Sequence, residues 1–284
     1  MHNKCLHQGI FPKQWKIAEI KVLLKNAEKP ATDIKSYRPI SLLPVLGKVL
    51  EKLIASRISF LSHNHPLTSS KQYGFKPGNS TEDAIVKIRS IAENSTRKYV
   101  IGLMFDISGA FDGVWWPSIL HNLKKRDCPR NLYKLIANYF SDREARITNN
   151  TMQVTTSVSK GCPQGSVLGP QLWNLIIDEA IEDISETGNQ AIAYADDIAI
   201  IVTGNSRKEI EQEANKVTEI LMQCQKQKLQ LSSNKSHMIL LKDILDIRRP
   251  PTVPIGNKSL RMVADTKYLG MYIGTRLNIT HKLH

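Results

Sequence analysis

The apolar residues of this chain follow two patterns, short continuous runs and runs spaced three to four residues apart. Residues 17–24 form an apolar, β-branched stretch, and residues 99–105 form a short continuous run typical of a central sheet strand. Between them, apolar residues recur at helical spacing over 46–61 and 84–92, and Ser80 or Thr81 would cap the second run. This part of the chain is therefore predicted to contain two amphipathic helices followed by a strand.

Beyond residue 106 the chain alternates between helical and strand-like runs. Predicted elements are helices around 119–123 and 132–140, a hairpin turning at Asn149-Asn150, a helix from Gly169-Pro170, strands at 191–195 and 198–202, an amphipathic helix at 210–224 and a strand at 238–241. Apart from insertions, the order is strand, helix, strand, strand, helix, strand. That order predicts the α+β class, with a split βαβ antiparallel sheet backed by two helices.

Three carboxylates fall at predicted strand ends. Asp106 follows the strand at 99–105, and Asp196-Asp197 form the bend of a tight strand pair. An isolated Asp-Asp would be an ordinary turn, but the predicted sheet places Asp106 on the neighbouring strand. Three such groups repel one another unless metal ions neutralise them. Two Mg²⁺ ions bridged by carboxylates serve phosphoryl transfer, which favours polymerase chemistry.

Composition narrows the class of protein. The chain has 284 residues, of which 41% are hydrophobic and 23% charged, so a globular protein of about two domains is expected. The four cysteines are far apart and form no Cys-x-x-Cys pair, which predicts reduced thiols and no zinc ribbon. No apolar run approaches the length of a membrane span and residues 1–9 resemble no secretory signal. An intracellular protein without a membrane segment is expected.

The charge points to a polyanionic partner. The net charge is +13, and the first hundred residues contain 17 Lys and Arg against 7 Asp and Glu. Such a section is typical of nucleic-acid binding, although a lysine-rich solubilising surface would have the same composition.

Several segments together resemble a known family. The segments Phe-Asp-Ile-Ser-Gly-Ala-Phe-Asp at 105–112, Pro-Gln-Gly at 163–165 and Tyr-Ala-Asp-Asp at 194–197 resemble, in that order, the motifs of reverse transcriptases. Residues 37–43, 73–81 and 161–170 are similar to non-LTR, LINE-type retrotransposon enzymes of the jockey-like sort. The resemblance runs from about Trp15 to about Ile273.

This resemblance implies a right-hand polymerase fold. Residues 1–98 would be a basic fingers subdomain, and residues 99–284 a palm with a ferredoxin-like sheet and a primer-grip-like hairpin. Part of the fingers would return within 116–160. The endonuclease, thumb and tail of full-length relatives are expected to lie outside this chain.

The resemblance also implies a metal site. Asp106 and Asp196 would bind two Mg²⁺ ions, with Mn²⁺ as a possible substitute, and Asp197 would support the site. The backbone carbonyl of Ile107 would complete a metal shell. Lys235 matches the lysine thought to protonate the departing pyrophosphate.

Other matched residues would contact the nucleotide and the primer. Lys25 and Arg38 would grip the triphosphate, although Lys21 or Lys35 could replace Lys25 in that role. Phe111 would clash with a 2′-hydroxyl and so select deoxynucleotides. The remaining implied contacts are Gln164 and Gly165 at the base pair, and Leu269 and Gly270 at the primer end. For Asp112, a structural hydrogen-bonding role and a chemical role are equally compatible with the resemblance.

The implied activity is RNA-directed DNA synthesis, with an RNA template, a DNA primer and deoxynucleoside triphosphates as partners. The family's habit of copying at chromosomal targets implies nuclear residence, and no oligomeric state is predicted. One alternative is a truncated, catalytically silent retrotransposon remnant that binds nucleic acid. Another is a nucleotide cyclase on the same sheet, which leaves Phe111, Gln164 and Gly165 unexplained.

Overall fold

The computed structural model describes residues 1–26, 30–64, 69–149, 152–223, 230–243 and 249–280. Two compact units are present, and each consists of two stretches of chain. Unit 1 comprises residues 1–67 and 111–176, and unit 2 comprises residues 68–110 and 177–284. This division differs from the subdomain boundary that was predicted at residue 98. The assignment of fingers and palm to the two sides of that boundary stays a prediction.

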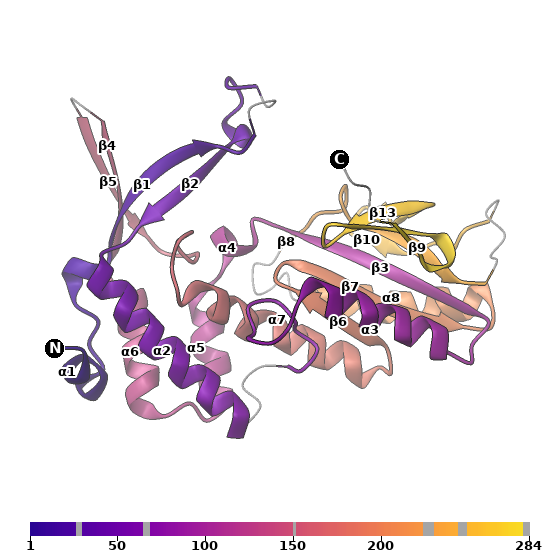
Figure 1. Cartoon of the computed structure of the whole chain (residues 1–284), viewed down its shortest axis with the longest axis horizontal. Helices are drawn as coiled ribbons and strands as arrows, with labels where there is room; N and C mark the ends of the chain where they lie inside the picture. Colours follow the sequence, from indigo (N-terminus) through magenta and orange to yellow (C-terminus); the bar gives the residue numbers. More distant parts are fainter. Residues whose placement is uncertain (27–29, 65–68, 150–151, 224–229, 244–248, 281–284) are drawn as a thin grey trace. The chain divides into compact units, whose positions relative to one another are not determined.

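Unit 1 contains a four-stranded sheet in the order β2-β1-β4-β5 (Figure 1). Its strands are β1 (Ile17–Leu24), β2 (Tyr37–Leu42), β4 (Arg143–Asn149) and β5 (Met152–Val158). Strand β1 is antiparallel to β2 and parallel to β4, and β4 and β5 form the predicted hairpin. Of its predicted turn, Asn150 lies outside the described residues.

Helices of unit 1 bury an aromatic core. They are α1 (His2–Gln8), α2 (Val45–Asn64), α5 (Trp116–Lys125), α6 (Arg130–Phe140) and the first part of α7 (Gly169–Glu186). The rings of Phe11 and Tyr139 meet edge to face with centroids 5.0 Å apart, and Trp116 stacks on Phe140 at 5.1 Å. Such pairs stabilise a core beyond the area that they bury.

Unit 2 is built on the sheet β12-β9-β3-β7-β6, with β8 paired to the end of β3. The strands are β3 (Tyr99–Ser108), β6 (Gln190–Tyr194), β7 (Asp197–Gly204), β8 (Gln230–Leu231), β9 (His237–Lys242) and β12 (Arg261–Val263). Strand β3 is central and antiparallel to both β7 and β9. The order β9-β3-β7-β6 is the predicted split βαβ sheet.

Helix α3 (Thr81–Asn94) covers one face of this sheet. Its buried residues Ala84, Ile85, Ile88 and Ala92 form a cluster with apolar residues of β3, β6, β7 and β9. Its N-terminus has a full capping box, in which Ser80 and Asp83 exchange hydrogen bonds. The sequence predicted the helix and its cap, and placed it within the basic N-terminal section.

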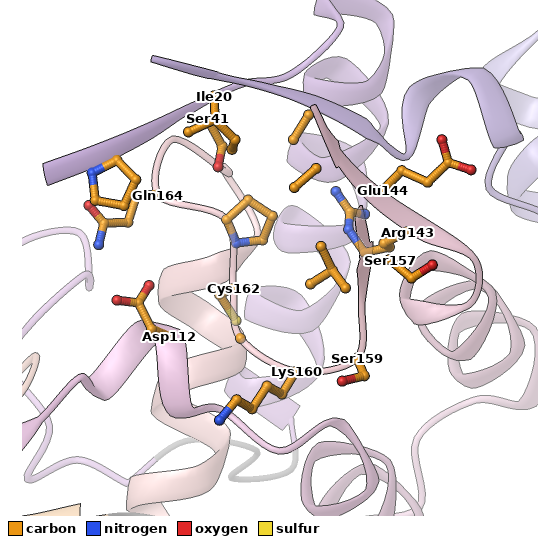
Figure 2. Close-up of a pocket in the computed structure, with 16 residues that line it drawn as sticks. Ile20, Ser41, Asp112, Arg143, Glu144, Ser157, Ser159, Lys160, Cys162 and Gln164 are labelled. Atoms are coloured by element: carbon orange, nitrogen blue, oxygen red, sulfur yellow. The ribbon is translucent and has the colours of Figure 1, made fainter. Parts of the chain in front are cut away.

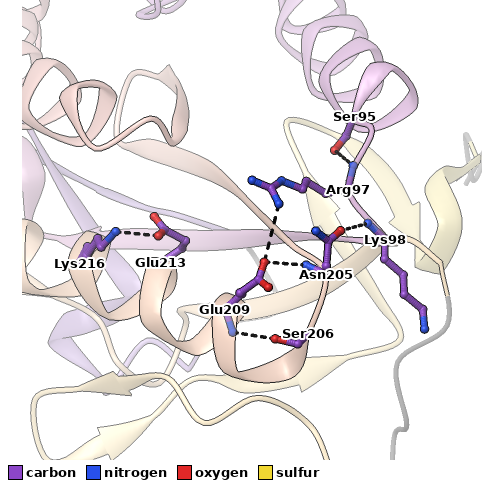
Figure 3. Close-up of polar contacts among 8 residues, drawn as sticks. All are labelled: Ser95, Arg97, Lys98, Asn205, Ser206, Glu209, Glu213 and Lys216. Carbon is purple, nitrogen blue, oxygen red and sulfur yellow. Dashed lines mark hydrogen bonds and ion pairs between the residues drawn. The ribbon is translucent and has the colours of Figure 1, made fainter.

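Helix α8 (Arg207–Gln223) packs against β7 and contacts β3. Figure 3 shows how its first turn is joined to the ends of these strands. Ser206 Oγ accepts from the Glu209 N–H, and Glu209 accepts from the Asn205 N–H. Asn205 Oδ1 accepts from the Lys98 N–H at 3.1 Å, and Arg97 lies 3.9 Å from Glu209. These contacts fix the sheet at the end opposite Asp106. Cys224, predicted in the same helix, lies outside the described residues.

Shorter elements complete the chain. They are α4 (Ala110–Gly113), the strands β10 (Pro254–Ile255), β11 (Lys258–Ser259), β13 (Asp265–Tyr268), β14 (Met271–Gly274) and β15 (Asn278–Thr280), and 3-10 turns at Lys13–Trp15, Ile34–Ser36 and Thr275–Leu277. Within the described residues, no helix combines the length and apolarity needed to cross a membrane.

Candidate active site

Asp106 and Asp197 lie directly opposite each other on neighbouring strands of unit 2. The antiparallel register of β3 and β7 pairs these two residues, and Tyr194 of β6 pairs with Asp197 across the adjoining hairpin. Asp196 occupies the intervening turn after Ala195, whose φ of 59° is left-handed. The predicted convergence of the three acidic residues at one end of the sheet is therefore present in the structure.

The charges of these carboxylates interact. Burial raises the pKa of Asp197, and so do the negative charges of Asp196 and Asp106, whereas the Lys235 ammonium lowers it; together they bring the pKa to about 6. Within the described residues, no group of three or more Asp, Glu, His or Cys side chains is arranged so that it could hold a metal ion. The donor set is nevertheless one that hard divalent cations prefer, and a cation would relieve the repulsion.

Lys235 contacts the first of these carboxylates. Its Nζ lies 3.2 and 3.3 Å from the two carboxylate oxygens of Asp106. The Lys235 side chain is 68% exposed, so its ammonium reaches the cluster from the solvent side. The predicted general acid and the predicted metal ligand are therefore neighbours.

A tight turn at residues 232–236 holds Lys235 in place. The Ser232 N–H donates to the Asp106 carbonyl at 2.8 Å, and the Asp106 N–H donates to Ser236 Oγ at 3.3 Å. Within the turn, the N–H groups of Lys235 and Ser236 both donate to the Ser232 carbonyl. Next to Asp106, the buried residue Ile107 pairs with Leu231 of β8. Sequence reasoning missed Ser236, because a lone serine after a lysine has no distinguishing pattern.

The predicted primer-grip residues form a two-residue hairpin turn. Tyr268 and Met271 are paired in β13 and β14, and Leu269 and Gly270 between them have φ values of 49° and 87°. Two positive φ values are typical of a type I′ turn. The buried hydroxyl of Tyr268 has no hydrogen-bond partner among the described residues, and burial together with the charge of Asp197 raises its pKa.

Unit 1 holds the residues that were predicted to contact the nucleotide. The Ser41 N–H of β2 donates to the Gln164 carbonyl at 2.8 Å. Gly165 has a φ of 115°, and a Cβ there would lie 2.7 Å from the Ser41 carbonyl oxygen. Glycine is thus required for this close approach. The structure joins the strand that carries Arg38 to the Gln164 loop.

The other nucleotide candidates lie on separate elements of unit 1. Arg38 is exposed on β2 opposite Leu23, and Lys25 is exposed just after β1, with its N–H donating to the Ser36 carbonyl. Phe111 is half-buried in α4, and its ring lies 5.8 Å from that of Trp173. The described contacts do not bring Lys25, Arg38 and Phe111 together. Their roles stay predictions.

A cavity of about 370 Å³ lies beside the Gln164 loop within unit 1. Figure 2 shows Gln164 and Asp112 on one side of it and Arg143 on the other. Arg143 is buried, donates to the Tyr139 carbonyl at 3.1 Å and lies over the Tyr139 ring. Burial raises the pKa of the lining Cys162 thiol to about 12, so this cysteine is an inert wall residue.

Buried polar residues that sequence reasoning missed support both units. In unit 1, Glu51 of α2 accepts from Ser166 Oγ at 2.9 Å and from the Val167 N–H at 2.7 Å, just after the Gln164 loop. In unit 2, Gln72 is fully buried beside the Asp196 turn. The sequence shows a glutamate in a helix and a glutamine in a loop, and neither pattern predicts burial.

Comparisons with known proteins agree with these features. Residues 25–273 match the family described as reverse transcriptase (RNA-dependent DNA polymerase). The chain is 35% identical over 279 residues to the retrovirus-related Pol polyprotein of type-1 retrotransposable element R1 from Bradysia coprophila, covering 98% of this chain and 28% of the relative. It is 32% identical over 212 residues to the RNA-directed DNA polymerase of mobile element jockey from Drosophila melanogaster, covering 72% of this chain and 23% of the relative.

The fold is shared with solved structures. Apo telomerase from Candida tropicalis, truncated from its C-terminal domain, superposes with a TM-score of 0.64 at 10% identity, covering 96% of this chain and 56% of that chain. This likeness confirms the predicted right-hand polymerase class. The chain spans little more than a quarter of the R1 relative's length. The predicted resemblance to non-LTR retrotransposon enzymes is confirmed, and the chain belongs to the reverse transcriptase (RNA-dependent DNA polymerase) family.

Proposed function

We propose that this chain is the polymerase region of a non-LTR retrotransposon reverse transcriptase and extends a DNA primer on an RNA template. One observation carries the proposal. Asp106 and Asp197 are paired across β3 and β7, with Asp196 in the adjoining turn and Lys235 in contact with Asp106. Acidic residues on neighbouring strands are suited to metal-assisted phosphoryl transfer.

The metal site follows from the same residues. Reverse transcriptases use divalent metal ions. Burial and the negative charges of Asp196 and Asp106 raise the pKa of Asp197, and this repulsion between carboxylates fits a site that receives cations. We propose that Asp106, Asp196 and the Ile107 carbonyl hold two Mg²⁺ ions, which Mn²⁺ can replace, and that Asp197 supports them. Bound there, the ions would activate the primer 3′-hydroxyl and stabilise the leaving pyrophosphate.

Lys235 would act as the general acid. In the structure its ammonium is hydrogen-bonded to Asp106 and exposed to solvent. Lys235 Nζ would give its proton to the pyrophosphate oxygen as the bond to the α-phosphorus breaks, and solvent would restore that proton.

The remaining residues would bind the substrates. Arg38 and Lys25 would hold the triphosphate, and Phe111 would exclude a 2′-hydroxyl. The proposed base-pair contacts are Gln164 and Gly165, and Leu269 and Gly270 would hold the primer end. Their support is the Ser41–Gln164 hydrogen bond and the tight turn at Leu269-Gly270. The proposed partners are an RNA template, a DNA primer and deoxynucleoside triphosphates, and the proposed place of action is the nucleus.

Primer extension tests this function. The purified chain, and a longer protein that adds the flanking segments of a relative, would be incubated with oligo(dT) on poly(rA), dTTP and Mg²⁺. We expect extension that EDTA abolishes. If both proteins are folded and bind the duplex but neither extends the primer, the function is instead nucleic-acid binding without synthesis.

A further inference from the structure

Residues 69–76 run beside β6 of unit 2 as an extra edge segment. The Tyr73 N–H donates to the Ala193 carbonyl at 2.7 Å, and the Ala193 N–H donates to the Lys71 carbonyl at 3.0 Å. Gln72 forms a parallel bridge with Ala193. These bonds attach the segment to the strand that leads into Asp196.

Gln72 reaches from this segment into the acidic turn. Its side chain is fully buried, and its Oε1 accepts hydrogen bonds from the Ala195 N–H at 3.2 Å and the Gly74 N–H at 2.9 Å. Ala195 immediately precedes Asp196 and is in the left-handed region. An alanine adopts that conformation only when its surroundings hold it there.

Gly74 allows the segment to approach the turn. A Cβ at this position would lie 2.2 Å from the Ala195 nitrogen and 3.0 Å from its Cα. Both neighbours are backbone atoms, so no side-chain movement could relieve the clash. The φ of Gly74 is not in the left-handed region, so glycine is needed for the close approach itself.

The start of the segment is anchored independently. Asp178 of α7 is buried, and its Oδ2 accepts from the Ser69 N–H at 2.8 Å. Lys76 Nζ donates to the Ser69 carbonyl, which closes the segment into a loop. The Gln72 amide oxygen therefore belongs to a segment that is anchored by hydrogen bonds, and not to an unanchored loop.

We propose that Gln72 is a positioning residue for polymerisation. Its amide oxygen holds the Ala195 N–H, and this bond keeps Asp196 in the orientation that binds metal. The inference rests on the proposed function, because it assigns Asp196 as a metal ligand. It adds that the geometry of this ligand is set by the segment 69–76, which contributes no metal ligand of its own.

The first test removes the acceptor and keeps the side-chain size. Gln72→Met has a similar length but no amide oxygen, and Gln190→Met changes an exposed glutamine at the start of β6 as a matched control. Three quantities are measured: hydrogen exchange of the Ala195 amide, Mn²⁺ affinity by electron paramagnetic resonance, and kcat and KM for primer extension.

We expect Gln72→Met to lose protection of the Ala195 amide, bind Mn²⁺ more weakly and lower kcat by about tenfold or more, with KM for dTTP little changed. Misplacing a reacting group by about 1 Å can reduce a rate about a hundredfold. Gln190→Met should match the wild type in all three. A folded Gln72→Met protein with wild-type Ala195 exchange and Mn²⁺ affinity would overturn the proposal.

Two further variants keep the proposal testable if Gln72→Met does not fold. Gln72→Glu retains an acceptor oxygen and should restore Ala195 protection. Gly74→Ala should reduce Mn²⁺ affinity, whereas Val86→Ala should not, because the Val86 side chain is 63% exposed on α3. Equal Mn²⁺ affinity in both alanine variants would reject the positioning role. If the wild type extends no primer, the proposed function fails, and the exchange measurements still decide the role of Gln72.

Discussion

At the scale of single residues, the contact between the Lys235 ammonium and the Asp106 carboxylate is central to the proposed chemistry. Lys235 is the one cation that the structure shows within hydrogen-bond distance of Asp106 among the described residues. Its ammonium neutralises part of the carboxylate charge, and in the proposed role of general acid it would also supply a proton to the leaving group. These two contributions can be separated by substitution.

Replacing Lys235 tests the general-acid role. Lys235→Ala should lower kcat by about 10²-fold or more. Lys235→Arg should stay low as well, because a guanidinium keeps the positive charge but does not release a proton near neutral pH. Single-turnover primer extension measures both variants, with the exposed Lys208→Ala as control. Full activity of Lys235→Arg would show that only the charge matters.

Asp197 makes stability depend on pH. Burial and the charges of Asp196 and Asp106 raise its pKa to about 6, whereas an unfolded aspartate titrates near about 3.9. Between these values the folded state binds more protons than the unfolded state. The free energy of unfolding therefore falls as pH rises from about 4 to about 6.

Thermal unfolding of Asp197→Asn in EDTA checks this expectation. The amide cannot ionise, so the variant should be more stable than the wild type at about pH 7.5 and nearly equal to it at about pH 4. A stability difference that is the same at both pH values would contradict the assignment of the raised pKa to Asp197.

At the scale of elements, the spacing of apolar residues was sufficient to predict a helix or strand where one of its faces is buried. Residues 17–24, the 84–92 helix and the strand pair around Asp196-Asp197 were predicted and are present as β1, α3, β6 and β7. Strand β3 extends to Ser108, beyond its apolar run, because β8 pairs with Ile107 and Ser108. Pairing with a distant segment is not encoded in the local pattern.

The apolar positions of α2 and α3 show a second limit of prediction from the sequence. In α2, Leu50, Ile54 and Ile58 are buried, whereas Leu46 and Val49 of the same predicted helix are 46% and 43% exposed. Helical spacing indicates that some face is buried but not which surface covers it. For the same reason, the sequence placed α3 in an N-terminal section although it covers the sheet of unit 2.

Helix α3 should therefore contribute to the stability of unit 2. Ile88 is fully buried in the cluster that α3 forms with the sheet, and Val86 of the same helix is 63% exposed. Ile88→Ala should lower the free energy of unfolding by about 2–5 kcal/mol, and Val86→Ala should change it by less than about 0.5 kcal/mol. Chemical denaturation measures both, and equal effects would contradict the packing of α3.

At the scale of the whole molecule, most of the excess positive charge lies in unit 1. Unit 1 contains 19 Lys and Arg against 8 Asp and Glu, a net charge of +11, whereas unit 2 contains 20 against 18. The sequence located the excess in the first hundred residues, and the fold adds the basic residues of 111–176. An excess of this size suits a polyanionic partner.

The candidate site, like the fold, was predictable from the sequence only in part. Asp106, Asp196 and Asp197 were identified because they lie where apolar runs end. Lys235 was identified by the resemblance to reverse transcriptase motifs alone. Gln72 and Ser236 could not be identified in this way, since they act through hydrogen bonds to backbone groups of distant segments. Such contacts become visible only when the sheet and its edge segment are assembled.

The most direct test of the central claim is primer extension by wild-type protein, Asp196→Asn and Asp127→Asn with Mg²⁺ on an RNA template. Asp127 lies outside the acidic cluster, in a left-handed conformation that asparagine tolerates. We predict that Asp196→Asn lowers the extension rate about a thousandfold while duplex binding persists, and that Asp127→Asn extends normally. Undiminished extension by a folded Asp196→Asn protein would contradict the assigned metal site.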